Sequence, residues 1–561
     1  MYCNKENINI LTSLLCKCGI TDVVVCPGSR NAALTHNFNE CETLNCYPIT
    51  DERSAGFYAL GMMQALRDET GNVRPVAVCV TSGTALLNLA PAVAEAFYQH
   101  LPLIVISADR PACWIGQLDG QTLPQTSALG ALVGCSVTLP EPATAEERWH
   151  CNCLVNKALA CATSFDAQPA HINVPISEPL FECCVPSLPE ERLVRVAEAA
   201  ASDASCVAPL LESLKKSARP MLVLGQNPCW LSDEEIVALG CAMVVLHEPT
   251  GRNAVSPCLF DDVLYAIQED ERYIPDLIIY AGDTVVSKRL KRFLRKTHKA
   301  EQWRLETGGG MPDTFMGLSC VLRCNPSVVL PKLAADCVPN ASATPFVALW
   351  NEALKAASQH ASDYQPPFSS MAAVKYMEEQ FEDLFCDYAV HYGNSTPIRL
   401  ANIYAWHHVW CNRGVNGIEG SLSAAAGFSV KSGKRVFCVI GDLSFFYDQN
   451  ALWNANLHGN LRIILLNNGK GAIFDQLKGL DESAARDTYV AASHATQAQG
   501  ICTQNDIGYM KAADMQEMQV GVVRLMTAET QRPMLLEVLI PAEDDEKAMK
   551  EYYETIKTYI Q

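Results

Sequence analysis

Two stretches in the last third of the chain decide the fold: RVFCVIGDLS at residues 435–444 and RIILLNNGKG at residues 462–471. Each is a short apolar run that ends in polar residues, which is typical of a buried strand followed by a loop. The 26 residues between Asp442 and Asn468 (468 − 442) leave room for one helical crossover between parallel strands. Because open α/β sheets bind ligands at the carboxyl ends of their strands, we expect these two side chains at one sheet edge.

Short apolar runs alternate with Ala- and Leu-rich helical stretches along the whole 561-residue chain, which predicts parallel α/β sheets. The predicted strands are 22–26, 75–80, 103–107 and 171–174, then 221–224, 243–246 and 276–280, then 388–391, 435–440, 462–466 and 534–539. Linker-like segments at 186–219 and 362–367 separate the three groups. We therefore predict an α/β protein of three doubly wound parallel-sheet domains, at residues 1–186, 187–362 and 363–561.

The bulk composition indicates a globular protein with a large interior, since 49% of the residues are hydrophobic and 19% are charged. The formal net charge of −19 disfavours a nucleic-acid partner, which would need a basic face. No apolar run approaches the ~18 residues of a membrane span, and residues 1–18 lack the basic start of a signal peptide. The 25 cysteines include no C-x-x-C pair, so we expect reduced thiols in a cytoplasmic protein without a membrane partner.

The polar ends of the two opening stretches suit a metal ion. Gly-Asp after a strand is by itself more often a turn or a helix cap, and Asn-Asn-Gly is usually a plain turn. Taken together, the Asp442 carboxylate, the Asn468 amide oxygen and a backbone carbonyl of the glycine-containing turn offer oxygen ligands. Mg²⁺ prefers such ligands and accepts phosphate oxygens for the rest of its shell.

The pattern G-D-x-S, followed after about 25 residues by N-N, resembles the diphosphate-binding motif of the thiamine-diphosphate-dependent enzymes. The resemblance implies thiamine diphosphate and Mg²⁺, or Mn²⁺ in its place, with Asp442, Asn468 and the Lys470 carbonyl as metal ligands. It also implies a glutamate on another domain that hydrogen bonds to the aminopyrimidine ring of the cofactor. Glu52 matches that position, although Asp-Glu at a helix start is often only favourable helix-dipole chemistry.

The same resemblance assigns further cofactor contacts, at strand-to-helix junctions that would otherwise be ordinary turns and caps. These residues are Ser29, Gly83, Gly393, Ser395, Gly417, Ile418, Gly441, Asp442, Leu443, Ser444, Asn468, Lys470, Gly471, Ala472 and Ile473. The large apolar side chain of Ile418 would hold the cofactor in a bent shape. Because this family usually builds its site between the first domain of one subunit and the third of another, we expect a homodimer or homotetramer.

Seven further segments resemble one branch of that family: 25–30, 51–57, 107–111, 171–179, 287–290, 393–399 and 412–420. That branch decarboxylates 2-oxoglutarate and adds the resulting succinyl carbanion equivalent to isochorismate in menaquinone biosynthesis. Since both substrates are dicarboxylates, the pocket needs fixed cations. The resemblance implies Arg399, Arg413 and Ser395 for the oxoglutarate-derived chain. For isochorismate it implies Arg30, Arg110, Gln117, Lys288 and Arg289, with Phe474 lining the pocket.

Three alternatives remain open at this point. A pyruvate-using enzyme of the acetolactate-synthase or decarboxylase kind would share the cofactor, but would not need this set of basic residues. A non-catalytic relative would not need Glu52, Asp442 and Asn468 together. A nicotinamide or flavin enzyme is disfavoured because no G-x-G-x-x-G follows the first strand. Three departures from the branch also stand out: Gly116 precedes Gln117, the acidic Asp119 lies near a proposed anion pocket, and Lys470 stands where small residues are common.

Overall fold

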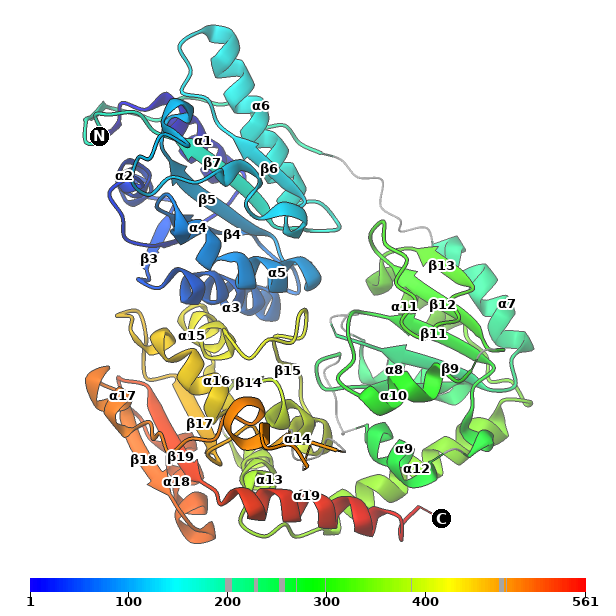
Figure 1. Cartoon of the computed structure of the whole chain (residues 1–561). Helices are drawn as coiled ribbons and strands as arrows, with labels where there is room; N and C mark the ends of the chain where they lie inside the picture. The colour runs from blue at the N-terminus through cyan, green and yellow to red at the C-terminus, as the bar shows by residue number, and fades with distance from the viewer. Residues whose placement is uncertain are drawn as a thin grey trace.

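The computed structural model describes residues 1–560 apart from 197–203, 227–230, 252–257, 269, 298, 385, 474–478 and 481. Three parallel sheets, each flanked by helices, form three lobes, as the sequence predicts (Figure 1). The first sheet has the order β3-β2-β4-β5-β7-β6. Its strands are β2 Asp22–Val25, β3 Asn45–Pro48, β4 Val76–Val80, β5 Leu103–Asp109, β6 Cys135–Thr138 and β7 Ala170–Pro175. Its helices are α1 Glu6–Lys17, α2 Ala32–Glu40, α3 Glu52–Thr70, α4 Thr84–Asn88, α5 Ala90–Tyr98 and α6 Ala145–Ala162. The short strands β1 Tyr2–Cys3 and β8 Cys183–Val185 form an antiparallel pair next to this sheet in sequence.

The central sheet has five strands in the order β10-β9-β11-β12-β13. They are β9 Pro220–Leu224, β10 Val244–His247, β11 Leu277–Ala281, β12 Glu301–Glu306 and β13 Cys320–Arg323. The helices around it are α7 Ala208–Lys216, α8 Asp233–Ala242, α9 Phe260–Ile267, α10 Lys288–Leu294, α11 Pro326–Asp336 and α12 Thr344–Asp363. The predicted linker at 362–367 therefore begins in the last two residues of α12, and the predicted domain boundaries stay predictions.

The third sheet has the order β15-β14-β16-β17-β19-β18. Its strands are β14 Tyr388–Tyr392, β15 Val409–Trp410, β16 Arg435–Gly441, β17 Leu461–Asn467, β18 Gly508–Ala512 and β19 Met534–Leu539. Its helices are α13 Ser370–Gln380, α14 Thr396–Tyr404, α15 Ser421–Lys431, α16 Asp442–Tyr447, α17 Gln499–Gln504, α18 Met515–Thr527 and α19 Ala542–Ile556. Numbered within their own sheets, the strands of the first and third sheets have the same order, 2-1-3-4-6-5. The strand order reverses between strands 1 and 3, so each sheet offers a ligand-binding crevice there.

The first and third lobes meet along α3 and α15, which lie next to each other in Figure 1. The two helices approach through glycines. A Cβ atom on Gly61 of α3 would lie 1.8 Å from the carbonyl oxygen of Ala424, and one on Gly427 of α15 would lie 1.9 Å from that of Tyr58. Only glycine permits backbones to come this close.

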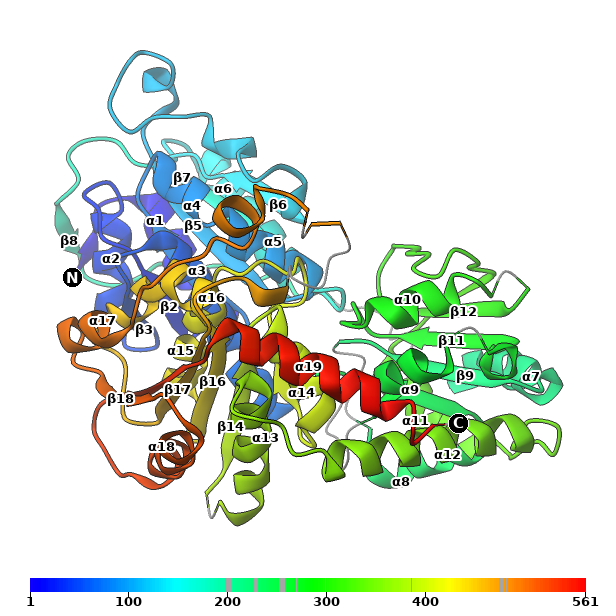
Figure 2. The ribbon, with the colours of Figure 1, turned by 60° about the horizontal axis from the view of Figure 1, so that its bottom comes forward.

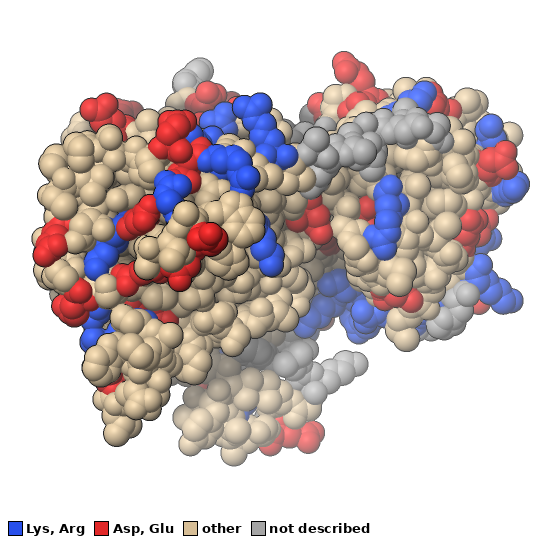
Figure 3. All heavy atoms as spheres, turned by 90° about the horizontal axis from the view of Figure 1, so that it is seen from above, with Lys and Arg blue, Asp and Glu red and all other residues tan. Residues whose placement is uncertain are grey.

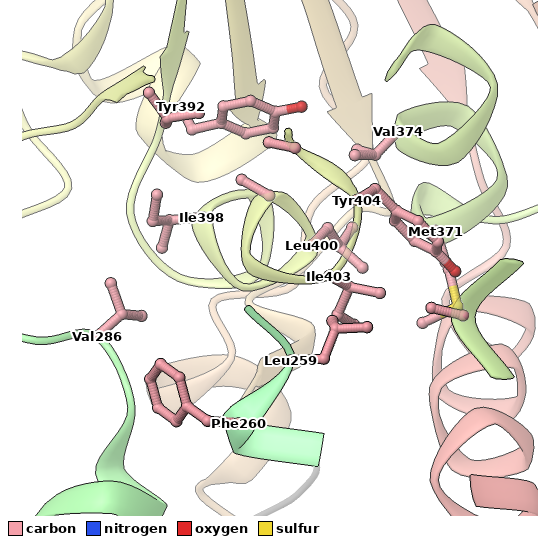
Figure 4. Packing of buried hydrophobic residues seen from close by; sticks show 14 of the residues in the cluster. Leu259, Phe260, Val286, Met371, Val374, Tyr392, Ile398, Leu400, Ile403 and Tyr404 are labelled. Atoms are coloured by element: carbon pink, nitrogen blue, oxygen red, sulfur yellow. The ribbon is translucent and has the colours of Figure 1, made fainter. Parts of the chain in front are cut away.

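The central and third lobes share one apolar core. Val286 and Phe260 of the central lobe lie on the side of α14 that carries Ile398, and Tyr404 at the end of α14 lies near Met371 (Figure 4). Helix α19 extends from the third lobe towards α9 of the central lobe (Figure 2). Because both lobes contribute to this core, α14 has a fixed position at their junction.

Other predictions concern the surface and the cysteines. Within the described ranges, no helix is long and apolar enough to cross a membrane. The described cysteines are free thiols, and several, such as Cys79 and Cys438, lie in buried central strands. Acidic and basic side chains are interspersed on the face in Figure 3, and basic side chains also lie in the hollow between the two lobes seen there.

Candidate active site

Asp442 and Asn468 lie at the carboxyl ends of neighbouring strands. β16 and β17 pair in parallel up to Gly441 and Leu466, and Asp442 begins α16 directly afterwards. The Asp442 Oδ2 atom accepts a hydrogen bond of 2.8 Å from the backbone N–H of Gly469, the residue after Asn468. The structure therefore brings the two predicted residues together at one sheet edge.

Two residues that the sequence did not indicate orient the Asn468 amide. Asn468 Nδ2 donates to Asp545 Oδ2 at 2.9 Å. Asp545, in the first turn of α19, also accepts from the backbone N–H of Ser370 at 2.6 Å and from its hydroxyl at 2.7 Å. With its nitrogen fixed on Asp545, Asn468 keeps its Oδ1 atom for the turn that follows, where Lys470 N–H donates to it at 3.3 Å.

The donor set at this edge fits a hard cation. Asp442 is buried, and burial raises the pKa of its carboxyl, so a nearby positive charge would stabilise the ionised form. The Lys470 carbonyl accepts from Ala472 N–H at 2.9 Å and has a second lone pair for a metal. In the described part of the chain, no cluster of three or more His, Cys, Asp or Glu side chains could hold a metal ion. A metal here would therefore use amide and carbonyl oxygens beside Asp442, as Mg²⁺ does.

The segment after β14 lies at the same edge, because β14 pairs with β16. Gly393 follows this strand directly, and Ser395 is the N-cap residue of α14 with φ at +75°, an unusual conformation for a residue with a side chain. Such local strain is concentrated at functional sites. Between them, Asn394 donates from Nδ2 to the carbonyl of Gly417 at 2.6 Å. This contact holds the loop that presents Ile418, a residue that is 39% exposed.

The other predicted cofactor contacts of the third lobe follow the same strands. Leu443 and Ser444 are in α16, and Gly471, Ala472 and Ile473 are in the loop after Lys470. Phe474 lies outside the described residues.

The crevice of the first sheet is built from the ends of β2 and β4. A Cβ atom on Gly28 would lie 2.3 Å from the Cβ of Thr81, so the turn that contains Ser29 packs against the end of β4. Gly83 has φ at +84°, and its N–H donates to the buried Gln125 Oε1 at 2.7 Å. Ser29 itself is exposed. The Gln125 contact was not predicted, since a polar residue in a loop has no local signal for such a role.

Glu52 begins α3 in the same lobe. Its carboxylate accepts from Asn88 Nδ2 at 3.2 Å and is half-buried. The two residues on either side of it contact the third lobe of the same chain. Asp51 accepts from Asn450 Nδ2 at 2.7 Å, and Arg53 donates to the Tyr447 carbonyl at 2.6 Å.

The predicted basic residues form two groups, and the first lies in the first lobe. Arg30 is buried, donates to the Ile176 carbonyl at 3.1 Å and lies 3.3 Å from a carboxylate oxygen of Glu178. Arg110 pairs with Asp119 at 3.1 Å, so this acidic side chain contacts a residue that is predicted to bind the substrate. Gln117 lies nearby in sequence and is exposed.

The second group lies where the central and third lobes meet. Burial, and then the charge of Arg413, lower the pKa of Arg399. The same two causes lower the pKa of Lys291, a residue of α10 that the sequence did not indicate. Arg289 forms an ion pair with Asp261, whereas Lys288 is exposed.

Two guanidinium groups in this second group have unused donors. Arg399 Nη1 and Arg413 Nε are buried and have no hydrogen-bond partner among the described residues. Arg413 Nη1 donates to Asn394 Oδ1 at 2.8 Å, which fixes the guanidinium next to Ser395. Buried donors without partners are costly, so this arrangement fits an anionic ligand that would accept from both.

Comparisons with known proteins show the family to which the chain belongs. Residues 8–129 match the family model of the thiamine pyrophosphate enzyme N-terminal TPP binding domain, and residues 393–543 match its C-terminal TPP binding domain. Three curated proteins named 2-succinyl-5-enolpyruvyl-6-hydroxy-3-cyclohexene-1-carboxylate synthase are similar over nearly their whole length. The protein of Bacteroides thetaiotaomicron is 41% identical over 99% of this chain and 100% of its own. That of Phocaeicola vulgatus is 40% identical over 99% of each chain, and that of Porphyromonas gingivalis is 33% identical over 100% of this chain and 98% of its own. The chain therefore belongs to the 2-succinyl-5-enolpyruvyl-6-hydroxy-3-cyclohexene-1-carboxylate synthase family of thiamine-diphosphate-dependent enzymes.

Proposed function

We propose that the enzyme decarboxylates 2-oxoglutarate and joins the remaining four-carbon unit to isochorismate, as a transferase of menaquinone biosynthesis. The observation that carries this proposal is the pair of buried, unpartnered donors on Arg399 and Arg413, next to the strained Ser395. A substrate with a second carboxylate, such as 2-oxoglutarate, would accept hydrogen bonds from both groups. Pyruvate lacks that carboxylate and would leave these donors unsatisfied.

The third lobe would hold the diphosphate and its metal. Asp442 and Asn468 would bind Mg²⁺, or Mn²⁺, through their side chains, and Lys470 through its carbonyl. When bound, thiamine diphosphate supplies the carbanion chemistry that no side chain provides. The residues of the chain bind it, orient it and exclude water. In this arrangement Ile418 would support the cofactor rings from the exposed loop.

Glu52 would share a proton with the aminopyrimidine ring. Asn88 donates to its carboxylate and so holds one oxygen in place. Thiamine-diphosphate-dependent enzymes usually build this site between the first domain of one subunit and the third of another, so we propose that it forms between two copies of the chain, in a homodimer or homotetramer. The exposed Leu87, Tyr98 and Tyr447 are apolar or aromatic side chains that such an interface would cover.

The isochorismate carboxylates would meet Arg30, Arg110, Lys288 and Arg289, with Gln117 and Phe474 as further contacts. Arg289 already has fixed geometry, because the rings of Tyr265 and Tyr553 lie 5.0 and 4.6 Å from its guanidinium carbon. Arg110 and Arg30 each have a carboxylate neighbour, which the substrate would have to compete with or displace.

Three parallel assays test the proposal: 2-oxoglutarate alone, pyruvate alone, and 2-oxoglutarate with isochorismate, each with Mg²⁺ and thiamine diphosphate. We expect product only in the third and slow CO₂ release in the first. Carboligation of pyruvate at a comparable rate would overturn the substrate assignment. A Glu52→Gln variant should lose about 10²–10⁴-fold in turnover, the usual contribution of a positioned acid–base group. Full turnover by that variant would remove the role given to Glu52.

A further inference from the structure

A buried carboxylate of the first lobe grips the loop that carries Arg413. Glu95 lies in α5 and is 2% exposed. Its carboxylate accepts from the backbone N–H of Gly414 at 2.6 Å and from that of Val415 at 2.7 Å. Burial raises the pKa of Glu95, and its hydrogen bonds oppose that shift. A buried carboxyl group that receives two backbone donors is a specific anchor for the loop.

The loop and α5 are also in direct van der Waals contact. A Cβ atom on Gly414 would lie 2.9 Å from the carbonyl oxygen of Glu95 and 3.0 Å from the Cβ of Tyr98. A side chain at this position would push the loop away from the helix. The first lobe therefore helps to set the position of the loop, although the residue that the loop presents belongs to the third lobe.

Further buried hydrogen bonds connect Glu95 to the core of the first lobe. Gln99 Nε2 donates to Glu95 Oε1, and Gln64 Nε2 donates to Gln99 Oε1 at 3.3 Å. Gln64 and Gln99 are buried, and Gln64 belongs to α3, the helix that starts at Glu52. A continuous set of buried polar contacts thus runs from α3 to the Arg413 loop.

The other lobes hold the same loop at different atoms. Thr284 of the central lobe donates to the Arg413 carbonyl at 2.7 Å, and Gln226 donates to the Cys411 carbonyl at 2.9 Å. Asn394 of the third lobe binds the carbonyls of Asn412 and Gly417. These contacts all use carbonyl oxygens, whereas Glu95 binds N–H groups, so none of them can replace it.

We infer that Glu95 is a positioning residue for the reaction: it fixes the Arg413 guanidinium for the substrate carboxylate from across the lobe boundary. This inference rests on the proposed function, in which Arg413 binds 2-oxoglutarate. The hydrogen-bond partners of the Glu95 carboxylate are Gly414, Val415 and Gln99, and none of these is a proposed metal ligand or cofactor contact. Loss of Glu95 should therefore affect 2-oxoglutarate binding more than cofactor binding.

The test compares Glu95→Gln with the wild-type holoenzyme. A glutamine offers one oxygen and one NH₂ group, so one of the two backbone N–H groups would face a donor. We expect the KM for 2-oxoglutarate to rise at least tenfold, with a smaller change in kcat and a thiamine diphosphate affinity within about twofold of wild type. Gly414→Ala should give the same pattern. Gly433→Ala is the matched control, since a methyl group there would meet nothing within 4 Å.

Hydrogen exchange of the 412–418 peptide gives a second reading that needs no substrate. Exchange in this peptide should be faster in Glu95→Gln than in wild type, while a peptide around Gly433 stays unchanged. Unchanged exchange, or an unchanged KM in Glu95→Gln when Arg413→Gln raises it, would overturn the role of Glu95 and leave the proposed function intact. A wild-type enzyme that does not use 2-oxoglutarate would instead overturn the proposed function. If thiamine diphosphate affinity, kcat and KM all fail together in Glu95→Gln, Glu95 is a structural residue and the inference is wrong.

Discussion

The close contact between α3 and α15 predicts that Gly61→Ala changes the stability of the protein. The sign of the change depends on whether the gain in helix propensity or the cost of overpacking is larger. Gly61→Ala should gain up to ~1 kcal/mol in helix propensity, because alanine is the better helix former. The added methyl group would lie 1.8 Å from the Ala424 carbonyl oxygen, which is roughly 1.5 Å closer than van der Waals contact allows. Since that oxygen belongs to a helix backbone, it cannot rotate away, and overpacking of this kind costs about 1–3 kcal/mol or more. We expect the cost to exceed the gain.

Thermal unfolding of the variants measures the outcome. A net loss of about 2 kcal/mol would lower the midpoint of the transition by about 4–8 °C in domains of this size. Gly427→Ala should behave alike, because its methyl group would lie 1.9 Å from the Tyr58 carbonyl oxygen. Gly240→Ala, in α8, is the control: nothing lies within 4 Å of its added methyl group, so only the propensity gain remains. A Gly61→Ala midpoint at or above that of wild type would refute the close helix contact.

Three further predictions concern single carboxylates. Asp545→Asn should weaken Mg²⁺ binding about 10–100-fold, because the Asn468 amide loses its orienting partner, and calorimetric titration with Mg²⁺ measures this. Burial raises the pKa of Asp262 to about 7, so the folded state keeps a proton that the unfolded state has lost between about pH 4 and 7. The free energy of unfolding of the wild-type protein therefore falls as the pH rises through this range. The Asp262→Asn variant has no such carboxyl group, so its stability relative to wild type should increase by up to about 4 kcal/mol between pH 4 and 8, as measured by denaturant titration. Asp119→Asn should free Arg110 and lower the KM for isochorismate by up to about fivefold, the value of a partly exposed ion pair.

Each of these three predictions would be contradicted by a different result. Glu543→Gln changes an exposed carboxylate in the same turn of α19 as Asp545 and should leave Mg²⁺ binding unchanged. Equal losses in the two variants would show a general charge effect. A difference between Asp262→Asn and wild type that does not vary with pH would contradict the raised pKa. A higher KM in Asp119→Asn would mean that Asp119 orients Arg110 and does not compete with the substrate.

The sequence predicts most strands inside the sheets and misses most strands at the sheet edges. Every predicted strand is present, and those in sheet centres, such as β4 and β16, are nearly continuous apolar runs because both faces are buried. The strands without a prediction include β3, β6, β13, β15 and β18, which all lie at sheet edges and carry fewer apolar residues. β12 lies inside the central sheet, but Glu301, Arg304 and Glu306 interrupt its apolar residues, so the sequence does not predict this strand. The shared strand order of the first and third sheets has no counterpart in any sequence repeat.

The sequence likewise predicts some residues of the candidate site and misses others. Asp442, Asn468 and Glu52 stand at strand or helix ends, where a local pattern marks them. Asp545 and Glu95 lie inside or at the start of helices far away in sequence, and only the folded chain brings them to Asn468 and Gly414. A local pattern contains no information about such distant hydrogen bonds, so residues that support a site are harder to predict than residues that form it.

Helix α19 lies almost wholly beyond the C-terminal match, which stops at residue 543. Asp545 at its start binds Asn468, Tyr552 donates to the buried Asp262 at 2.6 Å, and Tyr553 lies against Arg289. This single helix thus contacts both the proposed metal site and the lobe that the two family matches leave uncovered. In evolutionary terms, α19 should vary together with its distant partners, and a relative that replaces one partner should carry a compensating change in this helix.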